Sequence, residues 1–377
     1  MKTKIHIVSF DVPYPANYGG IIDVYERIKE LHKLDVEIYL HCFLYNEKKP
    51  QPHLDIYCKK VFYYKRNTGL KGISLLSPYI IYSRRNKALL KNLIEIYAPI
   101  LFEGVHTCYY INREELKDRN KIVRMHNVEQ DYYHQLSEVS TSFLKKMYYK
   151  IESKLILKYQ KKLSSATSFA CVSTEDELYF KRIFPNKKVL LIPSQNTHQT
   201  LEIKQGKGNY CFYHGNLGVL ENINSIKFLV EKIFLNLQQI LIIAGSNVDE
   251  NFKKYISKFD FVSLIENPDD DKMKQLMQDA QIHVLPTFQN TGLKLKLINS
   301  LYTARFVLCN NAMVKGSRLE AICYNANSIA HFQQRINELM QAEISISEIE
   351  NRKKILNEVF DNTENVKKFL DLITLKY

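Results

Sequence analysis

Residues 4–20 read KIHIVSFDVPYPANYGG and are followed by the stretch IIDVYERIKELHKL over 21–34. The short apolar run Lys4–Phe10 predicts a buried strand. The following residues contain two prolines, Gly19 and Gly20, and they predict a loop. Apolar residues at helical spacing then predict a helix over 21–34. A strand, a glycine-bearing loop and a helix in this order form the βα unit of a parallel sheet.

Short apolar runs alternate with helical patterns along the rest of the chain. In the first half, the further predicted strands are Val36–Phe43, Pro99–Phe102, Ile122–Met125, Phe169–Val172 and Val189–Ile192. In the second half, they are Tyr210–Tyr213, Ile240–Ala244, Phe261–Ile265, Ile282–Leu285 and Phe306–Leu308. Helical patterns there lie at about Asn222–Leu237, Asp249–Lys258, Asp269–Ala280 and Lys294–Tyr302. This alternation predicts parallel sheets with helices on both faces.

The 377 residues exceed what one hydrophobic core usually serves, so we expect two α/β domains. The stretch 194–209 is polar and shows no periodicity, which favours a linker. The predicted domains are therefore 1–193 and 210–350, with a helical segment over 351–377. Open α/β sheets bind ligands beyond the carboxyl ends of their strands. We expect two Rossmann-like domains that face a central cleft.

The composition is that of an ordinary globular protein, with 45% hydrophobic and 25% charged residues. No apolar run approaches the roughly 20 residues needed to cross a bilayer, and the short run Ile5–Phe10 is not a signal peptide. The seven cysteines are scattered without a C-x-x-C pair. This pattern favours buried free thiols over disulfides or a zinc site, so we expect a cytoplasmic protein.

The net charge of +13 is divided unevenly along the chain. Residues 1–196 contain 32 Lys and Arg against 20 Asp and Glu, whereas residues 197–377 contain 21 against 20. The basic half is expected to bind something negative, such as nucleic acid, anionic lipid or a phosphorylated substrate.

The most specific segment is LPTFQNTGLKLKLINSL over residues 285–301. A strand ends at its start, and we expect a helix to begin near Gly292 with Thr291 as its N-cap. Lys294 and Lys296 then lie in the first turn, where the helix dipole disfavours cations. An anion such as a nucleotide diphosphate would offset that cost. The alternative is that both are solvated surface lysines.

Three other segments follow predicted strands and carry polar residues or glycines. Gly19 and Gly20 could let backbone N–H groups approach a phosphate, although a tight turn is an equal explanation. The segment His214–Gly218 occupies the matching place in the second half. After Ile122–Met125 come His126 and Asn127, where a functional histidine and a structural one are both open.

Two charged segments have simpler explanations. Asp269, Asp270 and Asp271 have the spacing of a metal-binding motif, but they precede a predicted helix and favour N-terminal capping. The stretch Lys145–Lys162 carries seven lysines on an amphipathic helix. A solvated helix face explains them, and contact with a membrane surface is the alternative.

Together these motifs resemble retaining glycosyltransferases of family four, in particular bacterial members that build cell-surface polysaccharides. The resemblance spans nearly the whole chain and is strongest in the second half. The motifs are Pro13-Tyr-Pro with Gly19-Gly20, Arg124-Met-His126-Asn127, Val172-Ser173, Gly215-Asn216-Leu217 with Glu221-Asn222, and Thr291-Gly292-Leu293-Lys294-Leu295-Lys296.

The resemblance implies a GT-B fold in which the second domain binds a nucleotide-diphosphate sugar and the first binds a glycan or lipid-linked acceptor. It assigns catalytic roles to His126, which would contact the transferred sugar, and to Lys294 and Lys296, which would neutralise the diphosphate. Residues implied at the donor are Gly19, Gly20, Gly215, Asn216, Thr291, Gly292 and Asn299, and those at the acceptor are Asn17 and Asn127. The resemblance also implies that no metal or other cofactor is needed. The basic N-terminal half makes an anionic membrane surface a candidate partner, with peripheral attachment to the inner face of the cell membrane. Nucleic acid is not an expected partner, because the sequence shows no recognised nucleic-acid-binding motif.

The chain departs from the family pattern at two places. Two glutamates eight positions apart are common in the family, and they align here with Thr291 and Asn299. The loop at Gly215 lacks the usual Arg and Lys, with Asn216 and Glu221 in their places. Two alternatives therefore stay open: a nucleotide-sugar 2-epimerase, and a catalytically weakened GT-B protein that only binds.

Overall fold

The computed structural model describes residues 2–45, 48–140, 142–198, 200–289 and 291–375. The chain forms two compact units. The first unit comprises Met1–Thr197, Thr291–Leu293 and Phe360–Tyr377, and the second unit comprises His198–Asn290 and Lys294–Val359.

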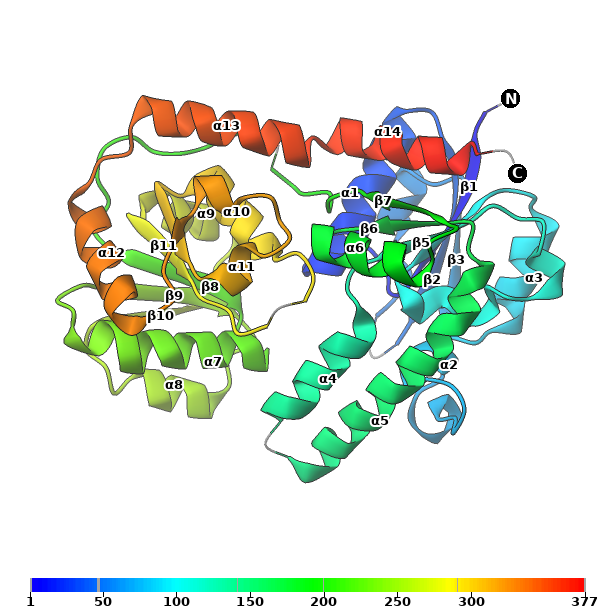
Figure 1. Cartoon of the computed structure of the whole chain (residues 1–377), viewed down its shortest axis with the longest axis horizontal. Helices are drawn as coiled ribbons and strands as arrows, with labels where there is room; N and C mark the ends of the chain where they lie inside the picture. The colour runs from blue at the N-terminus through cyan, green and yellow to red at the C-terminus, as the bar shows by residue number, and fades with distance from the viewer. Residues whose placement is uncertain (1, 46–47, 141, 199, 290, 376–377) are drawn as a thin grey trace. The chain divides into compact units, whose positions relative to one another are not determined.

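Within the described residues, the first unit is built on a seven-stranded parallel sheet of order β3-β2-β1-β4-β5-β6-β7 (Figure 1). Its strands are β1 (Lys4–Ser9), β2 (Glu37–Leu44), β3 (Lys60–Lys65), β4 (Ile100–Glu103), β5 (Lys121–Met125), β6 (Ser168–Cys171) and β7 (Lys188–Leu191). Its helices are α1 (Gly19–Lys33), α2 (Tyr79–Tyr82), α3 (Lys87–Glu95), α4 (Glu129–Val139), α5 (Phe143–Tyr159), α6 (Thr174–Ile183) and α14 (Asn362–Ile373). Short 3₁₀ turns are η1 (Pro52–Ile56), η2 (Gly69–Gly72), η3 (Val105–Tyr110), η4 (Glu114–Leu116) and η5 (Gln160–Ser165).

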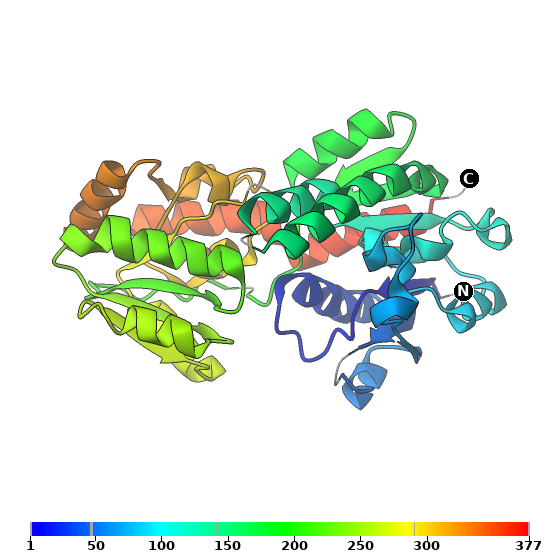
Figure 2. The same cartoon turned by 90° about the horizontal axis from the view of Figure 1, so that it is seen from below.

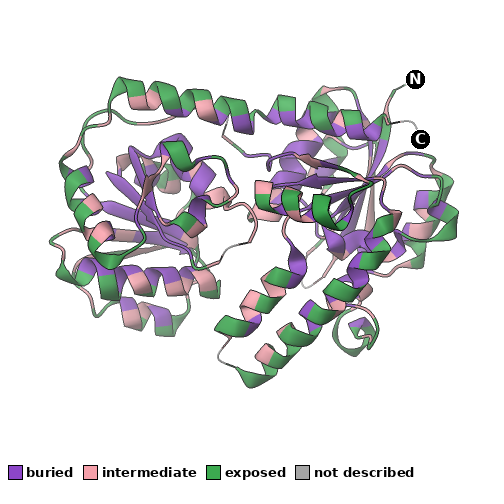
Figure 3. Cartoon of the chain, viewed as in Figure 1, coloured by how far each residue is buried: buried purple, intermediate pink, exposed green. Residues whose placement is uncertain are grey.

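Apolar side chains cover both faces of this sheet. Its inner strands are buried along most of their length, whereas the edge strands β3 and β7 are mostly half-buried or exposed (Figure 3). On one face, α1 and α14 pack together: Ile28 of α1 and Phe369 of α14 share a core with Ile7 of β1. On the other face, Leu93 of α3 and Phe180 of α6 belong to a second core. The last helix of the chain therefore completes the first unit.

The second unit repeats the plan on a sheet for which six strands are described, in the order β10-β9-β8-β11-β12-β13, again all parallel. Its strands are β8 (Cys211–Asn216), β9 (Leu241–Ser246), β10 (Val262–Glu266), β11 (Ile282–Leu285), β12 (Phe306–Cys309) and β13 (Tyr324–Asn325). Its helices are α7 (Leu220–Phe228), α8 (Glu250–Ile256), α9 (Asp270–Asp279), α10 (Leu295–Thr303), α11 (Asn311–Val314), α12 (Ile329–Gln341) and α13 (Ile346–Phe360). The π turn η6 (Leu229–Ile233) and the 3₁₀ turn η7 (Phe234–Asn236) prolong α7, and η8 (Glu320–Ile322) precedes β13.

Helix α13 is fixed to the second unit by Arg352, which is almost fully buried. Its guanidinium donates hydrogen bonds to the carbonyl oxygens of Ala304 at 2.5 Å and of Arg305 at 2.7 Å. These carbonyls follow α10 and lack partners within the helix, so the arginine satisfies them.

Helices α6 and α9 each begin at a side-chain cap, and the cap at Asp269 confirms the prediction. Ser173 caps α6, because its hydroxyl accepts a hydrogen bond from the backbone N–H of Asp176 at 3.1 Å. Asp269 caps α9 by accepting from the N–H of Lys272 at 2.8 Å. The aspartate run at 269–271 therefore has a structural role at a helix N-terminus.

Other segments differ from the sequence-based expectation. Strand β3 was not predicted, and its lysine-flanked, tyrosine-rich sequence is typical of an edge strand. The helical segment expected over 351–377 consists of two helices, α13 beginning at Ile346 and α14 at Asn362. The first change of unit along the chain falls between Thr197 and His198, inside the expected linker 194–209, and the chain returns to the first unit at Thr291–Leu293 and from Phe360 onward.

Helices α4 and α5 form an antiparallel pair that lies side by side in both views (Figures 1 and 2). The Ser153 hydroxyl of α5 donates a hydrogen bond to the Gln130 carbonyl of α4 at 2.7 Å. None of the described helices combines the length and the apolar character required of a membrane span.

We expect Phe369→Ala in α14 to destabilise the first unit by about 3–5 kcal/mol, because it empties a fully buried site between α14 and the sheet. Urea unfolding monitored by circular dichroism measures this change. Lys367→Ala, an exposed change on the same helix, is the control and should leave the unfolding midpoint nearly unchanged. Equal stability of both variants would show that α14 does not belong to this core.

Candidate functional site

Each sheet has one topological switch point. In the first unit, β1 has β2 on one side and β4 on the other, so the chain reverses its direction of growth between β1 and β4. In the second unit, the same reversal falls between β8 and β11. Ligands of open α/β sheets bind outside the carboxyl ends of the strands at this point. A site is therefore expected at these two switch points, at the edge of each sheet that the carboxyl ends of its strands form.

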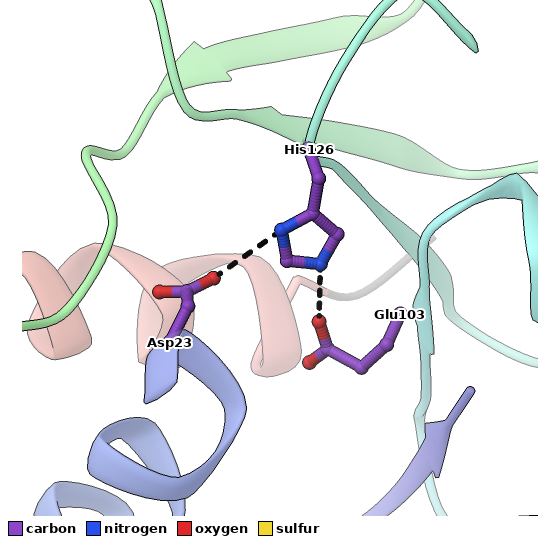
Figure 4. Close-up of side chains that lie close together, drawn as sticks. All are labelled: Asp23, Glu103 and His126. Carbon is purple, nitrogen blue, oxygen red and sulfur yellow. Dashed lines mark hydrogen bonds and ion pairs between the residues drawn. The ribbon is translucent and has the colours of Figure 1, made fainter. Parts of the chain in front are cut away.

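At the edge of the first sheet, His126 lies between two carboxylates (Figure 4). Its Nε2 lies 3.2 Å from Oε2 of Glu103, the last residue of β4, and its Nδ1 lies 3.8 Å from Oδ2 of Asp23 in α1. The histidine side chain is 13% exposed, whereas both carboxylates are buried. The ring is thus held in one orientation and stays partly accessible.

Two buried arginines neutralise the carboxylates. Arg27 donates to Asp23 Oδ2 at 3.0 Å and to Glu103 Oε2 at 3.1 Å, and Arg124 donates through Nε to Asp23 Oδ2 at 3.0 Å. Burial by itself would raise the pKa of Asp23, but the charges on Arg124 and Arg27 outweigh it and hold that pKa well below its usual range. Asp23 is therefore ionised at neutral pH.

Asp23, Glu103 and His126 also offer three ligand atoms within 4.8 Å of one another, which is close enough to hold a metal ion. Arg27 and Arg124 already supply two positive charges to the same two carboxylates. A divalent cation at this place would meet their repulsion, so the donor set fits a fixed histidine better than a metal centre.

The carboxyl of Glu129, at the start of α4, is a further titratable group near this edge. Asn127 Nδ2 donates a hydrogen bond to its Oε1 at 3.4 Å. Burial raises the pKa of Glu129 to about 7, and the hydrogen bond from Asn127 opposes that shift only in part.

At the edge of the second sheet, Lys296 lies against the end of β8. Its ammonium donates hydrogen bonds to the hydroxyl of Tyr213 at 2.9 Å and to the side-chain oxygen of Asn222, and it lies 4.8 Å from the centre of the Tyr213 ring. A Cβ placed on Gly215 would come within 3.4 Å of the ammonium nitrogen and 3.0 Å of the Asn222 amide nitrogen. The absence of a side chain at Gly215 thus leaves room for this cluster.

The end of β11 contributes a second polar group. The Thr287 hydroxyl donates a hydrogen bond to the carboxylate of Glu221, near the start of α7. Asn310 fixes the Thr287 backbone from both sides, accepting from its N–H at 3.1 Å and donating to its carbonyl at 2.7 Å. The carboxylate of Glu221 is thereby placed at the switch point of the second unit.

Beneath this edge, two buried histidines share the hydroxyl of Ser300 in α10. His214 Nε2 lies 3.1 Å and His283 Nδ1 lies 2.7 Å from the Ser300 oxygen. Burial lowers the pKa of His283 to about 4 and that of His214 well below its usual value, so both rings are neutral at pH 7. The group anchors α10 to β8 and β11.

The predicted start of this helix is wrong. Helix α10 begins at Leu295, with Lys294 in the N-cap position, so Thr291 is not its N-cap. Gly292 has a φ of +65°, a left-handed conformation that cannot belong to a right-handed helix. Lys296 lies in the first turn of α10, as the sequence predicted, whereas Lys294 lies directly before the helix.

The structure brings several predicted site residues together within each unit, while their assigned roles stay predictions. Gly215 and Lys296 meet in the second unit, and Asn216 is exposed beside them with Asn299 half-buried in α10. In the first unit, Asn17 is exposed in the loop before α1, whose first two residues are Gly19 and Gly20. A Cβ on Gly20 would lie 2.9 Å from the ring of Phe10, so close packing explains this glycine.

Sequence reasoning missed Asp23, Arg27 and Glu103. Two signals were present: Asp23 and Arg27 are four residues apart on a helix, and Glu103 directly follows the apolar run of a predicted strand. Both signals are common in exposed ion pairs. Only the tertiary structure shows that these residues are buried together.

We expect Glu129→Gln to change how stability depends on pH. Since the folded-state pKa of about 7 exceeds the unfolded value of about 4.3, the native state binds the extra proton between these pH values, and wild-type stability falls as pH rises through that window. The variant should match wild type near pH 4.5 and exceed it by up to about 3 kcal/mol at pH 8. Urea unfolding at both pH values measures this, with the exposed Glu95→Gln as control. Parallel pH profiles for wild type and Glu129→Gln would contradict it.

Comparison with known proteins gives one sequence relative. An uncharacterized 44.6 kDa protein in the cps region of Klebsiella pneumoniae is 27% identical over 334 residues, which cover 83% of this chain and 84% of that protein. No family model matches the chain.

Solved structures give the fold. Sucrose-phosphate synthase from Thermosynechococcus elongatus matches with a TM-score of 0.72 and 13% identity, over 98% of both chains. A mutant of S. aureus TarM in complex with fondaparinux, alpha-GlcNAc-glycerol and UDP matches with a TM-score of 0.70 and 10% identity, over 99% of this chain and 100% of that one. The trehalose-6-phosphate synthase OtsA matches at 0.62 and 10%, over 99% and 100%. With its two parallel-sheet α/β units, the chain has the GT-B fold of these glycosyltransferases.

Proposed function

We propose that this protein is a glycosyltransferase that retains anomeric configuration and moves a sugar from a nucleotide-diphosphate donor to a glycan or lipid-linked acceptor. The GT-B fold supports sugar transfer, and the structural neighbours include a complex with UDP and a glycan. The relative in a cps region supports a role in the synthesis of capsule or other cell-surface polysaccharide.

The proposal of a donor site in the second unit rests on one observation. Among the residues that the structure describes, the Lys296 ammonium is held by the neutral oxygens of Tyr213 and Asn222 rather than by a carboxylate. A positive charge that neutral groups position keeps its capacity to attract an anion. Because it lies at the start of α10 and at a switch point, a diphosphate is the anion that fits best.

In the proposed reaction, departure of the nucleoside diphosphate builds negative charge on the leaving oxygen. Lys296, Lys294 and the backbone N–H groups that begin α10 stabilise that charge, which makes a metal unnecessary. Gly215, Asn216 and Asn299 of the second unit are proposed to contact the donor. Gly19, Gly20, Thr291 and Gly292, which belong to the first unit, are proposed as further donor-binding residues.

In the first unit, His126 is proposed to contact the transferred sugar, with Asp23 and Glu103 fixing its ring. Both carboxylates are paired with buried arginines, so neither is free to act as a nucleophile. Attack of the acceptor on the same face as the leaving group, within an ion pair, is therefore preferred to a covalent intermediate. Asn17 and Asn127 are proposed to contact the acceptor.

We expect Lys296→Met and Lys294→Met each to lower kcat by about 10²–10³, with little loss of stability. Sugar transfer is measured with a panel of uridine and guanosine diphosphate sugars, and binding of the nucleoside diphosphates is measured by thermal shift. Lys258→Met, an exposed change in the second unit, is the control. A double variant at 294 and 296 that transfers sugar as fast as wild type would contradict the proposed donor site.

We expect Asp23→Asn to lower turnover about tenfold or more while diphosphate binding is retained, because the oriented imidazole is lost but the second unit is unchanged. His126→Gln should have an effect at least as large. Since Asp23 also pairs with two arginines, urea unfolding must accompany the assay, and a normal midpoint for His126→Gln keeps the test valid. Full activity of folded His126→Gln would exclude a role for this residue.

The same assays separate the alternatives. A 2-epimerase would convert the donor to its epimer without an acceptor. A protein that only binds would be stabilised by nucleoside diphosphates but would release no product from any donor.

A further inference from the structure

Helix α5 turns apolar side chains toward solvent. Phe143 is 74% exposed, Leu144 79% and Ile151 52%. Phe143, Met147 and Ile151 are spaced four residues apart, so they form one row along the helix, and Leu144 and Tyr148 form the next row on the same side. These apolar residues therefore lie on the outward side of α5, which Figure 3 colours largely green.

Lysines form a parallel row beside this apolar stripe. Lys146, Lys150, Lys154 and Lys158 are again four residues apart, and adjacent rows on a helix lie within side-chain reach. The single acid of α5, Glu152, is turned inward and is 2% exposed. The outward face of α5 thus combines apolar and cationic groups without a carboxylate.

A second exposed apolar segment is attached to the same helix. Leu70 is 88% exposed, Leu75 91% and Leu76 90%, and all three precede α2. The Glu152 carboxylate of α5 accepts hydrogen bonds from the backbone N–H groups of Tyr79 at 2.9 Å and Ile80 at 2.8 Å, the first residues of α2. These hydrogen bonds tie the start of α2, which follows residues 69–76 in the chain, to the inward side of α5.

We propose that the outward face of α5 and residues 69–76 form a docking surface for an anionic phospholipid membrane. Apolar side chains would enter the boundary between headgroups and acyl chains, and the lysine row would meet the lipid phosphates. Lysine stems can lie along the apolar stripe while their ammonium groups reach the headgroups. This goes beyond the proposed function, and it holds whether or not sugar transfer is found.

The combination of apolar and lysine side chains on this face favours a phospholipid membrane over other partners. A second copy of the chain would bring lysine row against lysine row, which is repulsive. Nucleic acid would meet the lysines but would leave leucines 70, 75 and 76 in water. A lipid surface satisfies both kinds of side chain at once.

The chain contains no tryptophan, which allows a direct test. In Phe143→Trp and, separately, Leu75→Trp, the single indole should shift its emission to shorter wavelength when vesicles of phosphatidylcholine with 30% phosphatidylglycerol are added. Brominated acyl chains should quench it. The matched control is Leu235→Trp, at a site in the second unit that is 55% exposed, and its emission should not change.

Flotation with the same vesicles tests the contribution of each row. The variant with Lys146, Lys150 and Lys154 changed to Gln should partition about a hundredfold more weakly, following roughly fivefold for each lysine, and high salt should weaken wild type similarly. Phe143→Ser with Leu144→Ser should lose flotation without losing its unfolding midpoint, because both sites are exposed.

Three outcomes would overturn the proposal. Wild type could fail to float with anionic vesicles, the lysine and apolar variants could float as well as wild type, or the surface variants could convert a dimer into a monomer in light scattering. The last would identify a second copy as the occupant.

Discussion

The first unit depends on the ion network around Asp23. This one carboxylate accepts hydrogen bonds from Arg27 in its own helix, from Arg124 in β5 and from the backbone of Gln195 beyond β7. The ring of Phe369 in α14 lies over the guanidinium of Arg27 at 4.6 Å. Burying these charges is costly, and the network offsets the cost only while every partner is present. His126 takes its orientation from the same group.

In the second unit, a partly buried charge has neutral hydrogen-bond partners instead. Lys296 is half-buried, and its ammonium is hydrogen-bonded to a phenol and an amide oxygen rather than to an acid. The buried charges around Asp23 in the first unit are therefore paired with one another, whereas in the part of the second unit that the structure describes the Lys296 ammonium has neutral partners. This contrast suits a histidine that must stay in place in one unit and a cation that must meet an incoming anion in the other.

The sequence predicted the repeating strand and helix pattern, and with it the two parallel sheets, because apolar periodicity is a local property. It also predicted the cap at Asp269, since capping depends on neighbouring residues. It failed where distant parts of the chain decide the outcome. The partners of Asp23 lie up to 172 positions away in sequence, and the start of α10 is set by the backbone conformation at Gly292.

Helix α14 has a consequence for how this protein is made. Its apolar face, with Val366, Phe369 and Leu372, covers the first sheet, yet it is synthesised after the whole second unit. A nascent chain that has left the ribosome through residue 197 therefore has an uncovered core face while the next 160 or so residues are translated. During that interval, chaperones can bind the exposed apolar face of the first sheet. A fragment that ends at residue 197 lacks α14 and leaves this face exposed permanently.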